Sequence, residues 1–340
     1  MNQKTKERSQ MTENIYDIAV IGGDGIGPEV VEAEIAVLEA TGLAWNFSSY
    51  EAGDDCLASR GQALPQATLD GALAAQAVIF GAAGVSAADV ILRLRAELGT
   101  FVNLRPSVAY KGVNCLHPQT DMMIVRENTE CLYAGIEAQL TPEVVTATRV
   151  ITSQASTRIV NYALEWARQA GGKKVTAVHK ANVLRKTDGH FLQCCRAAAR
   201  QFPDVPYEEA LVDSVAMRMA MRPEEFQVIV TTNLFGDILS DLAAGLIGGL
   251  GMCPSANLGQ AHALFEPVHG TAPDIAGQGK ANPSAAILCG AMLLRHLGQE
   301  QWAARVEKAV ADCVADGQAT SDLGGKLRTM EMARAVIDRL

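Results

Sequence analysis

Short runs of β-branched and apolar residues alternate along this chain with longer segments of helical periodicity. The runs that favour strands occupy residues 17–21, 77–80, 122–125, 174–178 and 228–231. Helical segments lie between them, at residues 28–41, 152–170 and 189–201, and two more follow near the C-terminus, at 283–297 and 299–315. Alternation of this kind predicts an α/β fold built around a mostly parallel sheet.

Composition excludes several classes of protein. The chain has 340 residues, 49% of them hydrophobic, which is enough for two domains or one large α/β unit. The formal net charge is -9 and no Lys/Arg-rich stripe occurs beyond the first eight residues, so we expect no nucleic-acid partner. The polar segment 1–14 lacks the apolar core of a signal peptide, and no run approaches the roughly 20 apolar residues of a membrane span. We therefore expect a cytoplasmic protein without membrane contact.

A glycine-rich turn, Gly-Gly-Asp-Gly-Ile-Gly-Pro-Glu (22–29), follows the first predicted strand. The cluster invites comparison with a dinucleotide fingerprint, which places its third glycine inside the helix and an acidic residue about 20 positions further on. Here the glycines end where Pro28 begins the helix. A tight strand-to-helix turn is at least as good an interpretation.

Asp237 and Asp241 lie four residues apart, shortly after the predicted strand 228–231. If a helix begins there, both carboxylates project from one face toward the same point. Such a pair suits Mg²⁺ or Mn²⁺, which prefer oxygen ligands. The spacing alone fits a solvated helix N-terminus equally well, because acidic side chains interact favourably with the helix dipole there.

Three arginines, Arg95, Arg105 and Arg126, stand beside apolar residues rather than in charge runs. The guanidinium fork binds a carboxylate through two hydrogen bonds, so three of them together would suit a di- or tricarboxylate, although each alone fits a structural ion pair. Tyr133 follows Arg126 by seven residues. Lys180 follows a predicted strand end, where a lysine can transfer protons, although a surface position is the simpler interpretation.

Taken with their neighbours, these residues form a series of motifs that resembles the β-decarboxylating dehydrogenases, which include isocitrate, homoisocitrate, isopropylmalate and tartrate/D-malate dehydrogenases. The motifs are Gly-Asp-Gly-Ile-Gly-Pro-Glu (23–29), Asn-Leu-Arg-Pro (103–106), Val-Arg-Glu-Asn-Thr-Glu (125–130), His-Lys-Ala-Asn-Val-Leu (179–184), Asn-Leu-Phe-Gly-Asp-Ile-Leu-Ser-Asp (233–241), Gly-Leu-Ile-Gly-Gly-Leu-Gly (245–251) and Glu-Pro-Val-His-Gly-Thr-Ala-Pro-Asp-Ile-Ala-Gly (266–277). They occur in the family's order between residues 17 and 336, and are most similar to those of NAD-dependent isocitrate and homoisocitrate dehydrogenases.

The resemblance implies a two-domain α/β fold that is not a Rossmann fold, with the active site in the cleft between the domains. One domain would combine residues 15–106 and 259–340 and bind the cofactor; the smaller one, 107–258, would dimerise, and 1–14 would form a tail. Lys180 and Asp213 would reach the site from the partner chain. A homodimer with shared active sites is therefore expected, with a tetramer as an alternative.

The resemblance also implies a role for each site residue. Arg95, Arg105 and Arg126 would bind the substrate carboxylates, Ile91 and Leu92 would contact the C3 substituent, and Asp213, Asp237 and Asp241 would hold Mg²⁺ or Mn²⁺, with a monovalent cation as a further option. Lys180 would take the hydroxyl proton as hydride leaves C2, and Tyr133 would protonate C3 after decarboxylation. The cofactor would contact Asn182, Glu266, His269, Gly270, Thr271, Ala272, Asp274, Ile275 and Asn282.

The expected cofactor is NAD. Asp274 and Ile275 stand where NADP-using relatives carry a Lys-Tyr pair. A carboxylate accepts hydrogen bonds from the ribose 2′-hydroxyl but repels a 2′-phosphate. The segment 321–325 also lacks the Tyr and Arg that bind the 2′-phosphate in those relatives.

The sequence gives conflicting signals on the substrate. The motif 125–130 resembles isocitrate and homoisocitrate enzymes, which favours oxidative decarboxylation of a (2R,3S)-type 2-hydroxy-3-carboxy acid of that kind. Ile91 and Leu92 instead resemble 3-isopropylmalate or D-malate/tartrate enzymes, because the segment 88–95 lacks the Ser and Asn that bind isocitrate's extra carboxylate. The loop 81–86 is several residues shorter than in relatives, and Cys131 replaces a glycine.

Two other classes of protein fit less well. A non-catalytic regulatory subunit of a heteromeric isocitrate dehydrogenase would lack the tyrosine, the lysine or the metal aspartates, and all of these are present. A nucleotide-binding module without catalysis would not require three arginines and three metal-type aspartates.

Overall fold

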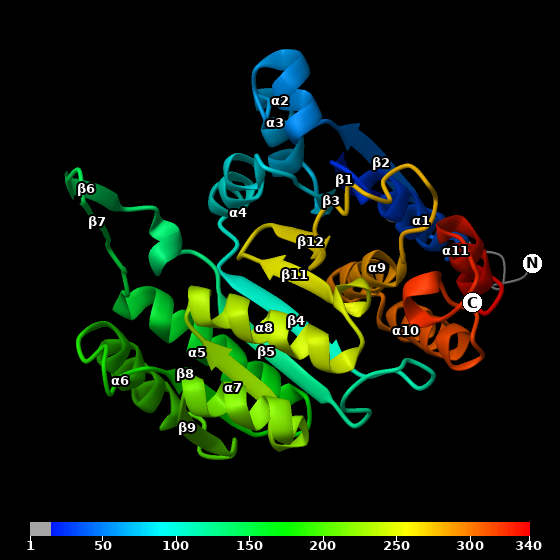
Figure 1. The fold of residues 1–340 in the computed structure, drawn as a ribbon. Helices are drawn as coiled ribbons and strands as arrows, with labels where there is room; N and C mark the ends of the chain where they lie inside the picture. Colours follow the sequence, from blue (N-terminus) through cyan, green and yellow to red (C-terminus); the bar gives the residue numbers. More distant parts are fainter. Residues whose placement is uncertain (1–14) are drawn as a thin grey trace, which may run out of the picture.

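The computed structural model describes residues 15–340, so the predicted tail at 1–14 lies outside the described residues. A ten-stranded sheet forms the centre, in the order β2-β1-β3-β12-β11-β4-β5-β10-β8-β9 (Figure 1). Its strands are β1 (Tyr16–Gly23), β2 (Trp45–Tyr50), β3 (Ala77–Ala82), β4 (Val102–Val108), β5 (Asp121–Glu127), β8 (Val175–His179), β9 (Tyr207–Leu211), β10 (Val228–Thr231), β11 (Pro254–Leu258) and β12 (Ala263–Pro267).

Six neighbouring strand pairs are parallel and three are antiparallel, so the predicted, mostly parallel sheet is confirmed. Four of the five predicted strand runs lie within β1, β3, β5 and β10, and the run 174–178 begins one residue before β8. Strands covered on both faces read as continuous apolar runs, and every residue of β3, β8 and β10 is buried. The antiparallel pairs are confined to the centre, β12-β11-β4-β5.

Helices cover the sheet in groups (Figure 1). Helix α1 (Gly27–Ala40) packs on α9 (Ser284–His296) and α11 (Thr329–Ile337), and α10 (Glu300–Ala315) packs on the same two. Helix α5 (Ser153–Gln169) packs on α6 (Thr187–Ala199), and α7 (Val212–Met221) on α8 (Asn233–Ile247). Shorter helices are α2 (Asp54–Arg60), α3 (Gln66–Ala74), α4 (Arg93–Glu97), the π-helix η2 (Ala88–Leu92), and the 3₁₀ turns η3 (Leu132–Ala134), η4 (Pro223–Glu225), η5 (Leu250–Met252) and η6 (Ser321–Leu323).

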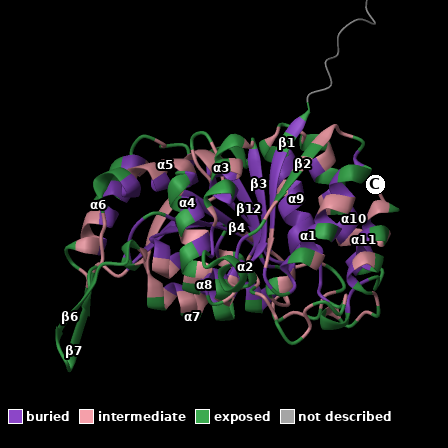
Figure 2. Cartoon of the chain, turned by 90° about the horizontal axis from the view of Figure 1, so that it is seen from above, coloured by how far each residue is buried: buried purple, intermediate pink, exposed green. Residues whose placement is uncertain are grey.

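One hydrophobic core runs through both ends of this arrangement. Val31 of α1 and Phe265 of β12 belong to the same buried cluster as Ile159 of α5 and Val230 of β10. Figure 2 shows the buried residues concentrated in the central strands and in α9. Burial of this apolar surface is the main term that stabilises the fold.

The glycine-rich turn lies where β1 passes into α1. The amide of Asp24 donates to the carbonyl of Ala82 at the end of β3, at 2.8 Å. A Cβ on Gly23, whose φ is +70°, would lie 1.8 Å from that carbonyl oxygen. Glycine is therefore required for close contact between the turn and β3, as expected for a tight strand-to-helix turn.

A hairpin of β6 (Glu137–Thr141) and β7 (Val144–Ala147) extends away from the main body (Figures 1 and 2). All residues of both strands are exposed. Cys131 and Val150 pair at its base. Over residues 15–340, no helix is both long enough and apolar enough to cross a membrane.

Candidate active site

The two aspartates of α8 face the same point. Asp237 Oδ1 lies 3.3 Å and Asp241 Oδ1 lies 3.6 Å from Nη1 of Arg105. Helix α8 begins directly after β10, and the four-residue spacing places both carboxylates on the side that faces β4. The helix that the sequence analysis required at this point is therefore present, with a carboxylate pair over the centre of the sheet.

Arg105 and Arg126 come from the adjacent antiparallel strands β4 and β5. Arg126 is 1% exposed; its guanidinium donates to Asn233 Oδ1 through Nε at 3.0 Å and Nη2 at 2.7 Å, and its Nη1 pairs with Asp237. A Cβ on Gly236 would lie 2.6 Å from Arg126 Cγ. Glycine at this position in α8 therefore makes room for the arginine to cross beneath the helix.

Arg105 is held by two polar side chains in addition to the aspartates. Its Nε donates to Asn103 Oδ1 at 2.7 Å, and its Nη1 donates to Ser240 Oγ at 2.7 Å. Burial lowers the pKa of Arg105, and it lowers that of Arg126 to about 10. Both groups stay cationic at neutral pH and lie in surroundings that favour binding of an anion.

Arg95 comes from α4. Its Nη2 forms an ion pair with Glu266 Oε1 of β12 at 2.6 Å, and Asn257 Nδ2 donates to the same oxygen at 2.6 Å. Its Nε is buried and has no hydrogen-bond partner. A buried donor without a partner is costly, so this atom is available for a ligand. We call Arg95, Arg105 and Arg126 the arginine cluster.

Tyr133 lies on η3, beside Asp237. Its hydroxyl donates to Asp237 Oδ2, and the Arg126 guanidinium lies 5.1 Å from the centre of its ring. Burial raises the pKa of Tyr133, and the hydrogen bond to Asp237 raises it further, so the hydroxyl remains protonated. Burial alone would raise the pKa of Asp237, but Arg126, the Tyr133 hydroxyl and Arg105 together hold it below its usual value.

Two adjoining cavities lie over the arginine cluster. One, of about 250 Å³, is lined by Ala87, Ala88, Ile91, Leu92, Arg95, Arg105, Arg126, Tyr133 and Asp237. The other, of about 190 Å³, shares Ala87, Ile91, Arg95 and Arg105 with the first and continues to Glu266, His269 and Gly270. Ile91 and Leu92 stand on the π-helix η2. Arg93 lines a different cavity, together with Asp89.

The short loop 81–86 is held by two carboxylates. Asp24 Oδ2 accepts from the amide of Gly84 at 2.8 Å, and Asp54 accepts from the amides of Val85 and Ser86 at 2.8 and 2.7 Å. Hydrogen bonds from Ser86 and Val85 lower the pKa of Asp54. The loop that leads into the π-helix is thus fixed despite its length.

Lys180 and Asp213 lie apart from the arginine cluster, at the β8 and α7 end of the sheet. Lys180 Nζ forms an ion pair with Asp213 Oδ1 at 2.6 Å, and the two side chains are 25% and 63% exposed. Within residues 15–340, no three acidic, His or Cys side chains gather to form a metal site. We call Lys180 and Asp213 the lysine pair. Within a single chain, the lysine pair lies away from Asp237.

The predicted cofactor residues divide into three groups. Glu266, His269 and Gly270 line the second cavity, and His269 Nε2 is buried without a partner. Thr271, Ala272, Asp274 and Ile275 follow in the next loop, where the Thr271 carbonyl accepts from the amide of Ile26 at 2.9 Å and Asp274 is exposed. Asn282 donates to Asp322 at 2.9 Å, whereas Asn182 is exposed and belongs to the segment that carries Lys180.

Several residues that support the site were not singled out from the sequence. They are Asn103, Asn233, Ser240 and Asn257, which position the arginine cluster through the hydrogen bonds given above and through a 2.8 Å contact from Asn103 to Asn257. Asn103, Asn233 and Ser240 lie inside motifs already recognised, so polar residues buried beside a candidate arginine were the available signal. Asn257 had no such signal.

Cys131 is buried and has a φ of 75°. This left-handed backbone region favours glycine, the residue that the resemblance leads one to expect at this position. Its amide donates to the Val150 carbonyl at 2.9 Å, so the residue closes the base of the β6–β7 hairpin just before Tyr133.

Known proteins match this chain along nearly all its length. Residues 17–336 match the family described as isocitrate/isopropylmalate dehydrogenase. A 3-isopropylmalate dehydrogenase of Archaeoglobus fulgidus is 54% identical over 95% of this chain and 99% of its own length, and an isocitrate/homoisocitrate dehydrogenase of Thermus thermophilus is 47% identical over 96% and 98%. The crystal structure of isocitrate dehydrogenase from Methylococcus capsulatus superposes with a TM-score of 0.92, at 44% identity, covering 95% of this chain and 99% of that one.

These matches confirm the resemblance and the fold class predicted from it. The sequence identities of 44–54% are much higher than two proteins need in order to share a fold. The chain therefore belongs to the isocitrate/isopropylmalate dehydrogenase family and is an oxidoreductase of the β-decarboxylating type.

Proposed function

We propose that this enzyme oxidatively decarboxylates a 3-alkylmalate, with NAD as hydride acceptor and Mg²⁺ or Mn²⁺ as its metal ion. The observation that carries the substrate class is the apolar part of the cavity lining, Ala87, Ala88, Ile91 and Leu92, which the arginine cluster shares. These side chains offer an alkyl group apolar contact and offer a third carboxylate no hydrogen bond. The relatives that are 54% identical are named 3-isopropylmalate dehydrogenases.

An isocitrate-like or homoisocitrate-like substrate, which the motif at 125–130 favoured, is the second candidate. The Thermus thermophilus relative named isocitrate/homoisocitrate dehydrogenase supports it. Its extra carboxylate would have to be bound by the arginine cluster itself, which the 1,4-dicarboxylate core of the substrate also needs. We therefore rank it behind the 3-alkylmalate.

The residues of the chain divide the chemistry among them. The arginine cluster binds the substrate carboxylates, with the buried Nε of Arg95 as a free donor. Lys180 of a second copy would accept the proton of the C2 hydroxyl, and NAD, held beside Glu266, His269 and Gly270 in the second cavity, would supply the hydride acceptor for C2. Carbon dioxide then leaves C3, and Tyr133 delivers a proton to that carbon. The raised pKa of Tyr133 keeps that proton on the hydroxyl until it is needed.

The metal ion fits the available donors. Asp237 and Asp241, joined by Asp213 of a second copy, would form an all-oxygen ligand set of the kind that Mg²⁺ and Mn²⁺ prefer. When bound, such an ion stabilises negative charge on the substrate oxygens. The separation of Asp213 and Lys180 from Asp237 within one chain supports a homodimer in which each site draws on both chains.

Mixed dimers test the shared site. A chain with Lys180→Met and a chain with Asp237→Asn are each expected to form an inactive homodimer. Carrying different affinity tags and purified through both, the mixed dimer contains one site with every residue intact, and we expect about half of the wild-type activity. A mixed dimer as inactive as its parents would overturn the shared site.

The substrate and the cofactor are tested together by kcat/KM values for 3-isopropylmalate, D-malate, tartrate, isocitrate and homoisocitrate with NAD and NADP. We expect 3-isopropylmalate to rank first among the substrates, because its alkyl group fits the apolar side chains of the cavity. We expect NAD to be preferred to NADP, because the exposed Asp274 carboxylate repels a 2′-phosphate. Leu92→Arg should lower its value by roughly 10²-fold and raise that of homoisocitrate. Isocitrate in first place would favour the second candidate, and equal use of NADP would contradict the cofactor.

A further inference from the structure

The main chain of Lys180 is fixed on both sides. Asp188 Oδ2, on α6, accepts from the amide of Lys180 at 2.6 Å. The carbonyl of Lys180 accepts from the amides of Val183 and Leu184 at 3.0 and 2.9 Å. The side chain can therefore reach outward only from a backbone position that Asp188 sets.

Asp188 is completely buried, and its second oxygen contacts Arg149. Oδ1 lies 2.8 Å from Arg149 Nη2, and both side chains are largely shielded from water. Burial raises the pKa of Asp188, and the charge of Arg149 opposes that rise. A buried ion pair of this kind is sensitive to the loss of either partner, because an uncompensated charge remains.

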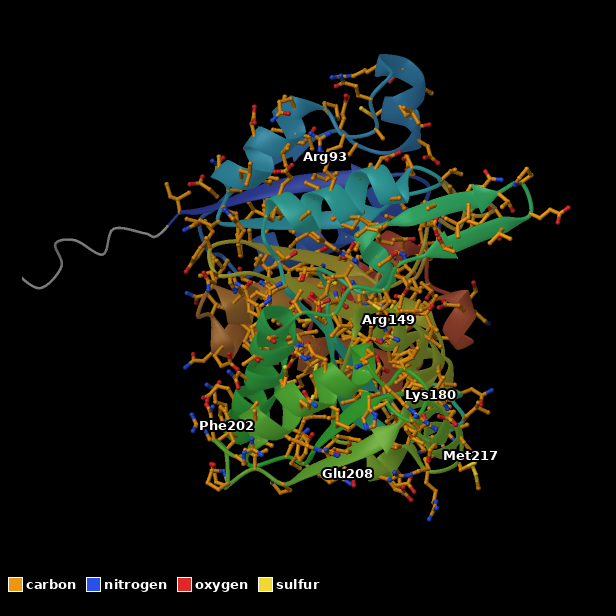
Figure 3. The ribbon with its side chains drawn as sticks, turned by 90° about the vertical axis from the view of Figure 1, so that its left-hand side faces the viewer. Arg93, Arg149, Lys180, Phe202, Glu208 and Met217 are labelled. Carbon is orange, nitrogen blue, oxygen red and sulfur yellow. The ribbon has the colours of Figure 1, made fainter. Side chains whose placement is uncertain are left out.

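Arg149 also reaches the beginning of α8. Its Nη2 donates to Thr232 Oγ1 at 2.8 Å, directly before the helix, and its guanidinium stacks over the Phe235 ring at 4.6 Å. Asp237 follows two residues after Phe235, on the same helix. Figure 3 shows Arg149 above Lys180 on the same side of the molecule.

We propose that Asp188 is a positioning residue for Lys180, and that Arg149 links this position to the helix that carries Asp237. The inference rests on the proposed function, in which the Lys180 of one chain serves the site of its partner. Arg149 would then connect two residues of one chain that serve different sites. Lys180 serves the site of the partner chain, and Asp237 serves the site of its own chain. Asp188 and Arg149 touch no substrate; they act through Lys180 and α8.

The mixed dimer separates the two roles. Its single intact site takes Asp237 from the Lys180→Met chain and Lys180 from the Asp237→Asn chain. Asp188→Asn, added to the chain that supplies Lys180, should lower kcat about tenfold and leave KM within about twofold, because a misplaced base slows chemistry more than binding. Added to the other chain, the same substitution should leave kcat within about twofold.

Arg149→Lys keeps the charge but loses the stacking on Phe235, and should lower kcat from either chain by about threefold. Asp204→Asn and Arg200→Lys are the matched controls, since both side chains are exposed and lie beyond the end of α6. Both are expected to have no effect from either chain.

If Asp188→Asn had the same effect in either chain, or no effect in either, the positioning role would be overturned. Activity of the mixed dimer without this substitution would still support the shared site. An inactive parental mixed dimer would instead overturn the shared site. If Asp188→Asn prevents assembly, Arg149→Lys decides: an effect from only one chain, or from neither, contradicts the link.

Discussion

The arginine cluster and the lysine pair, which we propose serve one reaction, differ in burial and in their place on the sheet. The three guanidinium groups come from α4, β4 and β5 over the centre of the sheet, are largely buried, and each has a carboxylate partner from the same chain. The lysine pair follows β8 and begins α7, nearer the β9 edge of the sheet, and its side chains are more exposed, at 25% and 63%. In the proposed reaction, the groups that bind the substrate carboxylates are thus complete in one chain, whereas the proton acceptor reaches them only from a second copy.

This difference predicts which residues contribute to both folding stability and catalysis. Charges buried together must compensate one another, so a change in the arginine cluster should affect folding and turnover at once. An exposed pair contributes little to folding, so a change there should affect turnover alone. Four substitutions test this division, and the first should have the largest effect.

Arg126→Met removes the guanidinium that compensates Asp237 and holds Asn233. We expect kcat/KM to fall by about 10³-fold or more, and the free energy of unfolding to fall by about 3–5 kcal/mol. Steady-state kinetics and urea unfolding measure the two quantities. Loss of activity at unchanged stability would contradict the expected link between folding and turnover in the arginine cluster, because the cluster would then resemble the lysine pair.

Lys180→Met should lower kcat by about 10³-fold, because it removes the proposed base. The melting temperature should change by no more than about 2 °C, since the two side chains are 25% and 63% exposed and water screens their interaction. Calorimetry beside kinetics gives both values for one preparation. Substantial residual turnover would show that another group accepts the proton.

Tyr133→Phe should slow oxidative decarboxylation by about 10²-fold and leave reduction of the corresponding 2-oxo acid nearly unchanged. The hydroxyl that donates to Asp237 is lost, but the ring beneath Arg126 remains. Rates measured in both directions distinguish the two steps. An equal loss in both would count against a role in protonation.

Glu34→Met should stabilise the protein without changing kcat. Glu34 is fully buried in α1, both carboxyl oxygens lack a partner, and burial raises its pKa well above 4.5. The folded state therefore favours the protonated acid, and the stability this confers is present below pH 4.5 and lost as the pH rises through the raised pKa. Methionine should gain about 1–3 kcal/mol at pH 8 and less at pH 5.

Urea unfolding at the two pH values tests this prediction. Glu32→Met, on the exposed face of the same helix, is the control and should show no such dependence on pH. Equal gains at pH 5 and pH 8 would show that Glu34 is charged in the folded protein. In contrast to Asp237, Glu34 has no cationic partner among residues 15–340, so its burial is not compensated by an ion pair.

The sequence predicted the strands that are apolar throughout, such as β3 and β10, because burial on both faces leaves a continuous signal. It did not predict β4, β11 or β12 from periodicity. These central strands carry Asn103, Arg105, Asn257 and Glu266 in buried positions, so the residues that build the site also interrupt the hydrophobic pattern. Motifs located Arg105 and Glu266 where periodicity could not.

The relation between the two parts of the site is beyond a single sequence. Lys180 and Asp237 are each recognisable from their motifs, but nothing in the order of residues along one chain says how a second copy approaches it. The π-helix that contains Ile91 and Leu92 was likewise not predicted, because its wider turn does not depend on a recognisable residue composition.

The centre of the sheet limits how the molecule can move. Strands β4 and β5 are paired in continuous register from Val102–Glu127 to Val108–Asp121, and they join the end of the sheet that holds Glu266 to the end that holds Lys180. Because this ladder is continuous, the two ends of the sheet can move apart only through elastic bending and twisting of hydrogen-bonded strands. Relative motion of the two ends should therefore meet a smooth restoring force rather than two locked positions of a hinge.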